Sequence, residues 1–177
     1  KLKKRLLNFV IIGGGFSGVE TSGELKEMID RLLIYYKNID KSEIKIHVVE
    51  ISNRLLPELD TKMSLYTQKV FRNLNIKLHL NTKLKEVSSL KVYLSNDISI
   101  DTNTVISTIG SSVSDIIKQA NMKLEKGRIL TNQYLEVVNN TNIWALGDCA
   151  FVPSNSKDVL IDSPLTAQCA VRQAHVL

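Results

Sequence analysis

The sequence predicts an α/β fold, in which helices cover a parallel β-sheet and a small antiparallel β-meander is added. Two patterns carry this prediction. Residues 9–50 read as strand, glycine-rich turn, helix and strand, which is a βαβ unit. Residues 76–108 read as short strands separated by polar turns. The 177-residue chain has 44% hydrophobic and 23% charged residues, which is an ordinary globular composition.

The βαβ unit begins with the apolar run "FVII" at 9–12, as expected for a strand buried on both faces. The second strand, "IKIHVVE" at 44–50, ends in an acid. Between them, apolar residues recur at three- and four-residue steps, which predicts a helix. The members of this stripe are Leu25, Met28, Ile29, Leu32, Leu33 and Tyr36.

After a loop with Pro57, residues 61–75 are expected to form a helix. Its inward face is predicted to carry Met63, Tyr66, Val70 and Leu74. A strand at 76–80, three short antiparallel strands and a buried strand at 103–108 complete this part.

The C-terminal third is less regular. We expect a short helix in "SVSDIIKQANM", a strand pair or an irregular excursion in "GRILTNQYLEV", and a last strand, "NIWALGD", at 142–148. A final helix is expected to begin near Pro164.

The main functional motif is G-x-G-x-x-G, formed by Gly13, Gly15 and Gly18. It follows a strand, opens a helix and precedes a strand that ends in an acid, which is the arrangement that binds a dinucleotide. One glycine makes the tight turn, one lets the backbone approach a pyrophosphate and one permits close packing of helix and strand. The helix N-terminus then presents free N–H groups to the phosphates.

Two acids accompany the motif. Glu50 is predicted to accept hydrogen bonds from the ribose hydroxyls of an adenosine, and its charge would repel a 2′-phosphate, which favours NADH over NADPH. Arg54 is close enough in sequence to soften that preference. Glu20 lies near the helix start, where two interpretations stay open: a favourable interaction with the helix dipole, or a catalytic role near the nicotinamide.

Charge and composition exclude several other functions. The net charge is +5, but part of the excess lies in "KLKKR" at residues 1–5, which we interpret as a solvated lead-in, and no basic stripe with interleaved aromatics indicates nucleic-acid binding. The two cysteines form no redox pair, the three histidines do not cluster as metal ligands, and no catalytic triad is apparent. We therefore expect no metal, and a cytoplasmic protein.

The order of the segments resembles the two-dinucleotide-domain flavoproteins, most closely the type II NADH dehydrogenases (NADH:quinone oxidoreductases). The resemblance rests on "RLLNFVIIGGGFSGVE", "HVVEISNRLLPELD", "VISTIG", "IWALGDCA" and "SPLTAQCAVRQ". It implies a Rossmann-like three-layer NADH-binding domain at 6–140, and at 141–177 a partial return segment of the FAD-binding domain. A related reductase of ferredoxin or rubredoxin, or a non-catalytic NAD-binding module, remains the alternative.

The resemblance also implies roles for individual residues. The NADH pyrophosphate would contact Gly13, Gly14, Gly15, Phe16, Ser17 and Gly18, with Thr108 and Gly110 near the middle of the cofactor. FAD would contact Asp148, Ala167 and Gln168. Gln168 and Gln173 would lie near the quinone, although Gln173 follows Gln168 by five residues where the family signature has four.

The resemblance further implies that hydride passes from NADH to FAD and electrons then pass to quinone. It suggests an internal fragment that is inactive alone. The intact protein would lie at the inner face of the cell membrane, reached through regions outside this chain, and a homodimer is left open.

Overall fold

The computed structural model describes residues 2–110, 114–154, 161–163 and 165–177. The chain forms two compact units, Lys1–Gly110 and Ser111–Leu177. Residues 114–140, which were expected in the NADH-binding domain, thus belong to the same compact unit as the C-terminal segment. Which cofactor each unit serves is a separate question.

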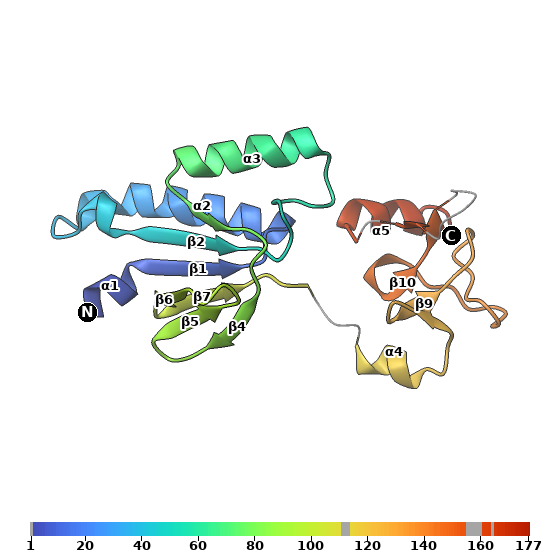
Figure 1. Cartoon of the computed structure of the whole chain (residues 1–177). Coiled ribbons are helices and arrows are strands. Elements are labelled where there is room, and N and C mark those ends of the chain that lie inside the picture. The colour runs from blue at the N-terminus through green and yellow to red at the C-terminus, as the bar shows by residue number, and fades with distance from the viewer. Residues whose placement is uncertain (1, 111–113, 155–160, 164) are drawn as a thin grey trace. The chain divides into compact units, whose positions relative to one another are not determined.

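The first unit is an α/β structure built on a four-stranded parallel sheet (Figure 1), which confirms the predicted fold class. The sheet order is β3-β2-β1-β7, with β3 at Lys77–His79, β2 at Lys45–Val49, β1 at Asn8–Ile12 and β7 at Thr104–Ser107. The long helices are α2 (Phe16–Leu32) and α3 (Thr61–Asn73), and the antiparallel meander consists of β4 (Leu84–Val87), β5 (Lys91–Leu94) and β6 (Ser99–Asp101).

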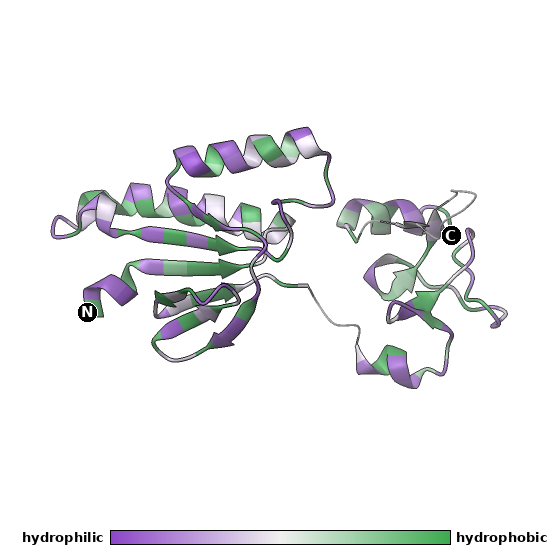
Figure 2. Ribbon diagram, viewed as in Figure 1, coloured by the Kyte–Doolittle hydropathy of each residue, from purple (hydrophilic) through white to green (hydrophobic). Residues whose placement is uncertain are grey.

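The two faces of the sheet have separate cores. Ile11, Ile46 and Val48 pack with Ile29 of α2 and Phe71 of α3. Val10, Ile12 and Val49 pack with apolar residues of the meander. Strand side chains alternate between faces, so a central strand must be apolar throughout, and Figure 2 shows mostly hydrophobic residues along β1.

The helix α3 faces the core differently from the prediction. Met63 and Tyr66 are 50% and 64% exposed, whereas the buried residues are Ser64, Gln68 and Phe71. The predicted inward face was therefore wrong at Met63 and Tyr66, and also at Leu74, which is 37% exposed and follows the last helical residue. The reason is that Ser64 and Gln68 have main-chain hydrogen-bond partners in the core, which allow polar side chains to be buried.

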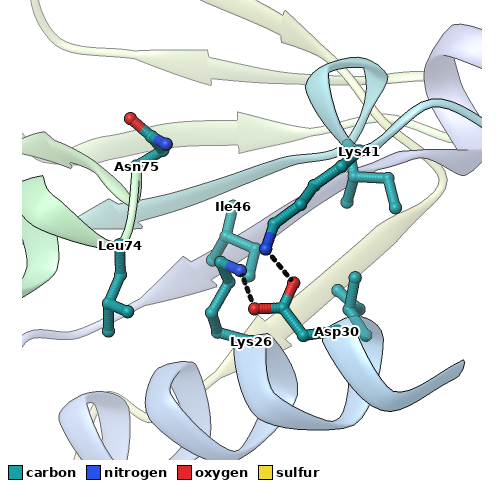
Figure 3. A pocket seen from close by; sticks show the side chains of 8 residues that line it. Lys26, Asp30, Lys41, Ile46, Leu74 and Asn75 are labelled. Carbon is teal, nitrogen blue, oxygen red and sulfur yellow. Dashed lines mark hydrogen bonds and ion pairs between the residues drawn. The ribbon is translucent and has the colours of Figure 1, made fainter. Parts of the chain in front are cut away.

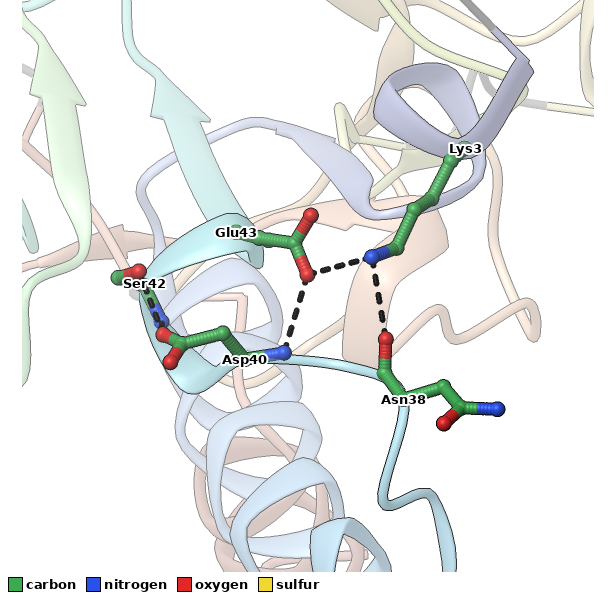
Figure 4. A network of polar contacts seen from close by, with 5 residues as sticks. All are labelled: Lys3, Asn38, Asp40, Ser42 and Glu43. Atoms are coloured by element: carbon green, nitrogen blue, oxygen red, sulfur yellow. Dashed lines mark hydrogen bonds and ion pairs between the residues drawn. The ribbon is translucent and has the colours of Figure 1, made fainter.

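The amino-terminal "KLKKR" segment contributes to a short helix, α1 (Leu2–Leu6), in which no residue is buried. Lys3 Nζ donates to Glu43 Oε2 at 2.6 Å and to the Asn38 carbonyl at 3.1 Å. Asp40 and Glu43 form a reciprocal cap of the single-turn helix η2 (Lys41–Glu43) (Figure 4). These contacts fix the chain just before β2.

A cavity of about 40 Å³ lies near the amino end of β2 (Figure 3). Asp30 of α2 forms ion pairs there with Lys26 and Lys41, and the hydrogen bond from Lys26 lowers the pKa of its carboxyl. Parallel strands present their binding edge at the carboxyl end. This cavity is therefore at the opposite edge of the sheet from the glycine turn.

The second unit is smaller. The strands β8 (Leu124–Glu125), β9 (Arg128–Leu130) and β10 (Ala150–Phe151) form one sheet, and β11 (Pro153–Ser154) pairs with β12 (Ile161–Asp162). The helices described in the second unit are α4 (Asp115–Gln119), the single turn η3 (Gly147–Cys149) and α5 (Ala167–Ala174). In the first unit, a single turn, η1 (Leu33–Tyr35), follows α2. The apolar core of the second unit includes Ile129, Leu135, Val137 and Val152.

The predicted last strand at 142–148 is wrong, and the two predicted helices of this part are described only in part. Residues 142–148 form no continuous strand: Trp144 makes one isolated bridge with Glu136, and the chain then turns into η3. The pairing is limited to this one residue pair, and three residues later the chain turns at Gly147, which has φ +69°. The last helix begins at Ala167, and Pro164 lies outside the described residues, as do residues 112 and 113 of the predicted short helix.

Candidate nucleotide-binding site

The glycine turn lies between the end of β1 and the start of α2. Gly13 has φ +109°, a conformation that side chains disfavour. A Cβ atom on Gly18 would lie 1.9 Å from the Gly13 carbonyl oxygen. The turn and the first helical residues are therefore in direct backbone contact, which is the close packing that the third glycine of the motif permits.

The N-terminus of α2 has no side-chain cap. Its N-cap residue is Gly15, and Phe16 and Ser17 are exposed. Within the described residues, no acceptor is recorded for the N–H groups of Phe16, Ser17 and Gly18. A 17-residue helix therefore offers free donors and the positive end of its dipole at this point.

Glu50 follows β2 directly and is 7% exposed. Its Oε2 atom accepts a hydrogen bond from the Gly14 N–H at 2.6 Å, and its Oε1 atom accepts one from the Ser52 N–H at 2.7 Å. Each carboxylate oxygen can accept a second hydrogen bond. Glu50 is thus both a brace for the glycine turn and a candidate acceptor for ribose hydroxyls.

Thr108 supports the turn from the adjacent strand end. Its N–H donates to the Ile12 carbonyl at 2.8 Å, and its hydroxyl donates to the same carbonyl at 2.9 Å. A Cβ on Gly13 would come within 2.7 Å of the Thr108 hydroxyl oxygen. Gly110 is exposed, and among the described residues no atom other than those of its chain neighbours lies within 4 Å of an added Cβ. Thr108 therefore packs against the turn, while Gly110 lies open.

Arg54 is tied into its own loop. Its Nη1 donates to Thr61 Oγ1 at 2.7 Å, and its Nη2 donates to the carbonyls of Pro57 and Leu59 at 2.9 and 3.1 Å. Both terminal nitrogens of the guanidinium therefore have partners within residues 57–61.

A second segment, Leu55 and Leu56, also contacts the glycine turn. This contact was not expected from the sequence. The Leu56 N–H donates to the Gly14 carbonyl at 2.8 Å. The preceding residue, Leu55, is fully buried, and its main chain is bound by Ser64 and Gln68 of α3. One sequence feature could have indicated this contact: Ser64 and Gln68 are two polar residues spaced four positions apart on an amphipathic helix.

A histidine pair lies next to Glu50 in the sheet. His47 Nδ1 and His79 Nε2 are 2.9 Å apart, and the His79 carbonyl accepts the Glu50 N–H at 2.9 Å. Burial lowers the pKa of His47 to about 4, with a further contribution from His79. Burial also lowers the pKa of His79. Both rings are therefore neutral at pH 7.

In the second unit, Asp148 is exposed within η3, and within the described residues no hydrogen bond to its carboxylate is recorded. Gln173 Oε1 accepts the Gly147 N–H at 2.8 Å, so α5 holds this turn. Ala167 and Gln168 are exposed in the first turn of α5, which Thr166 caps by accepting the Cys169 N–H at 3.2 Å.

The structure thus brings the first-unit candidates Gly13–Gly18, Glu50 and Thr108 together. Gln173 and Gly147 meet within the second unit. Glu20 is exposed in the second turn of α2, and within the described part of the chain no hydrogen bond or ion pair joins it to this cluster. Within those residues, no helix has the length and apolar character needed to span a bilayer.

Known proteins resemble the chain over nearly all of its length. It is 30% identical over 174 residues to a probable NADH dehydrogenase of Dictyostelium discoideum, covering 97% of this chain and 37% of that protein. It is 29% identical to a type II NADH:quinone oxidoreductase of Staphylococcus saprophyticus, covering 93% of this chain and 41% of that protein.

A solved structure, NDH2 from Plasmodium falciparum in complex with NADH, superposes with a TM-score of 0.74 at 28% identity. The match covers 85% of this chain and 33% of that one. The chain therefore spans between 33% and 41% of the length of these three proteins. The sequence profile of the pyridine nucleotide-disulphide oxidoreductases matches residues 1–174, and the chain belongs to this family.

Proposed function

We propose that this chain is the NADH-binding part of an FAD-dependent NADH:quinone oxidoreductase. The observation that carries the proposal is the geometry of the glycine turn, with free helix N–H groups beside a buried carboxylate. The relatives support it, because they are named as NADH dehydrogenases and one solved neighbour contains NADH.

The proposed pyrophosphate site is the start of α2. Gly13, Gly14, Gly15, Phe16, Ser17 and Gly18 form it, and their backbone supplies the donors. A diphosphate gains hydrogen bonds here and a favourable interaction with roughly half a positive charge at the helix end. An added Cβ would come too close to protein atoms at Gly13, Gly14 and Gly18, whereas at Gly15 the nearest atom is 3.9 Å away.

The adenosine ribose is assigned to Glu50, whose remaining lone pairs can accept two hydroxyl donors. A 2′-phosphate would face this carboxylate, and a charge pair at about 4 Å repels by roughly 4 kcal/mol at an effective dielectric constant of about 20. Arg54 is held in its own loop by Thr61, Pro57 and Leu59, but these partners are neutral, so its charge remains and reduces the repulsion of a 2′-phosphate. NADH is therefore the proposed dinucleotide.

The second unit is proposed to contribute to an FAD site. Asp148 would accept hydrogen bonds from a hydroxyl-bearing ligand, because its carboxylate is exposed and has no recorded partner within the described residues. Ala167, Gln168 and Gln173 are the proposed flavin and quinone contacts, although Gln173 has already used its carbonyl oxygen for Gly147 and keeps only its amide donors. When bound, FAD supplies the redox chemistry that links NADH to the acceptor.

The boundary between the proposed cofactor parts follows the compact units. Residues 6–110 are proposed to bind NADH, and residues from 111 onward are proposed to belong with FAD, in place of the expected division at 140. Because quinones are apolar, we further propose that the protein works at the cytoplasmic face of a membrane. A homodimer is an open part of this proposal.

The decisive experiment compares NADH and NADPH binding to the chain by calorimetric titration. We expect NADH to bind about 100-fold more tightly, consistent with two charged hydrogen bonds and the repulsion of a 2′-phosphate. Glu50→Ala should weaken NADH binding and narrow the preference. Glu86→Ala, which removes an exposed carboxylate on the meander, is the matched control and should change neither value. Equal binding of both dinucleotides by the unmodified chain would refute the proposal.

A further inference from the structure

The two peptide groups that meet at the Cα atom of Gly14 are each held by one hydrogen bond. On one side, the Gly14 N–H donates to Glu50 at 2.6 Å. On the other side, the Gly14 carbonyl accepts the Leu56 N–H at 2.8 Å. A trans peptide is planar, so its N–H and C=O point in opposite directions. Holding the Gly14 carbonyl toward Leu56 therefore directs the Gly15 N–H away from Leu56.

The segment that supplies this contact is itself held by α3. Gln68 Oε1 accepts the Leu55 N–H at 3.2 Å, and the Ser64 hydroxyl donates to the Leu55 carbonyl at 2.6 Å. Both polar groups of one buried main-chain residue are thus satisfied by two side chains one helical turn apart. The Leu55 side chain also lies against the turn, since a Cβ on Gly14 would meet its Cδ2 at 2.7 Å.

The burial of these two polar side chains is what makes the arrangement specific. Ser64 is 0% and Gln68 is 4% exposed, on the face of α3 where an apolar residue would ordinarily pack. A hydrophobic residue at either position could fill the core but would leave a Leu55 main-chain group unpaired. The next residue, Leu56, has φ +48°, a conformation that needs support from its surroundings.

We propose that Ser64 and Gln68 are positioning residues for dinucleotide binding. They hold Leu55 and Leu56 so that the Gly14–Gly15 peptide keeps its orientation and its N–H stays available to a diphosphate. This inference rests on the proposed function, because it takes the glycine turn as the diphosphate site. Neither side chain needs to touch the ligand.

The test uses Gln68→Met, which keeps the side-chain length but removes the acceptor, and Gln68→Glu, which retains an acceptor. Ser64→Ala removes the second contact with little change in volume. Phe71→Leu is the control, because it reduces the same core cluster without contacting Leu55 through a recorded hydrogen bond. Affinities for NADH and ADP-ribose are measured well below the unfolding temperature of each variant, so that all molecules are folded.

We expect Gln68→Met and Ser64→Ala to weaken NADH and ADP-ribose binding by the same factor, about fivefold or more, because both ligands carry the diphosphate. Gln68→Glu should bind NADH better than Gln68→Met. Phe71→Leu should lower the unfolding temperature and leave both affinities within about twofold. Hydrogen exchange at the Leu56 amide should become faster in Gln68→Met and not in Phe71→Leu.

The two hypotheses fail in different ways. If the unmodified chain does not bind NADH or ADP-ribose, the proposed function is refuted. If it binds them, and the folded Gln68→Met and Ser64→Ala variants bind equally well, the positioning role is refuted. Unchanged exchange at Leu56 in Gln68→Met would refute the positioning role whatever the ligand does.

Discussion

Two glycine-containing turns, one in each unit, are held in contrasting ways. In the first unit, the glycine turn is fixed by neighbouring strand ends and by a loop, and it leaves the N-terminus of α2 uncapped. In the second unit, the turn at Gly147 is held by Gln173, and the N-terminus of α5 is capped by Thr166. A turn that binds a phosphate must be rigid while its donors stay free, and of these two turns the first combines both properties.

Substitution of glycine by alanine should separate the two turns most strongly at Gly18. The added Cβ would lie 1.9 Å from a backbone oxygen, so α2 must shift. We expect loss of measurable NADH binding and a destabilisation of about 3 kcal/mol or more. Gly23→Ala is the matched control on the same helix, because no atom lies within 4 Å of its added Cβ. It should bind NADH normally and gain roughly 0.5–1 kcal/mol.

Acid should weaken the first unit selectively. The pKa of His47 is about 4 in the folded protein, below its ordinary 6.5, so the unfolded chain takes up a proton first as the pH falls. The free energy of unfolding therefore decreases below pH 6.5 and levels off near pH 4. At pH 5 the loss relative to pH 7.5 should be roughly 2 kcal/mol.

Urea denaturation can assign that loss to one unit. Trp144 is the sole tryptophan and lies in the second unit, while most helical residues lie in α2 and α3 of the first. The acid effect should appear in far-ultraviolet circular dichroism and be small in tryptophan fluorescence. His47→Gln should remove most of it. An equal acid shift of both signals would contradict the assignment to His47.

The stability of the turn at Gly147 should depend more on Gln173 than on Gly147 itself. Gln173→Leu removes the acceptor of the Gly147 N–H and should destabilise the second unit by about 1–2 kcal/mol. Tryptophan fluorescence during urea denaturation measures this loss, and the far-ultraviolet signal of the first unit should barely change. A variant with unchanged stability would show that the hydrogen bond is dispensable, and would leave Gln173 free for a ligand.

The smallest effect is expected for Gly147→Ala. Its φ of +69° disfavours a side chain, but the nearest atom to the added Cβ, on Ala170, is 3.5 Å away, which is an ordinary contact. The cost should be about 1 kcal/mol, from backbone conformation alone. The same fluorescence-detected denaturation tests it. A loss as large as that of Gly18→Ala would mean that steric contact, rather than conformation, also governs this turn.

The sequence predicted those parts of the fold that short-range patterns determine. The strands β1 and β2, the helix α2 and the three meander strands were expected close to where they lie, because strand and helix periodicities differ clearly there. The failure at 142–148 has a different origin: a strand needs a neighbour along its length, and Trp144 forms only one isolated bridge.

The candidate site was predictable to a similar degree. The glycine spacing and the acid after β2 placed Gly14 and Glu50 at one sheet edge, where they are indeed hydrogen-bonded. Ser64 and Gln68 were not predicted, because their inward orientation depends on Leu55, a partner 9 and 13 residues away whose main-chain position no local pattern reveals. Hydrophobic periodicity selected exposed Met63 and Tyr66 instead.

The hydrogen bonds of Arg54 bear on any redesign of dinucleotide choice. Replacing Glu50 alone would remove a repulsive charge without moving a cation into its place, since three hydrogen bonds hold the Arg54 guanidinium to Thr61, Pro57 and Leu59. An engineered NADPH-dependent form would need a new cation from another position. Freeing Arg54 for that purpose would remove the hydrogen bonds that it makes within its own loop.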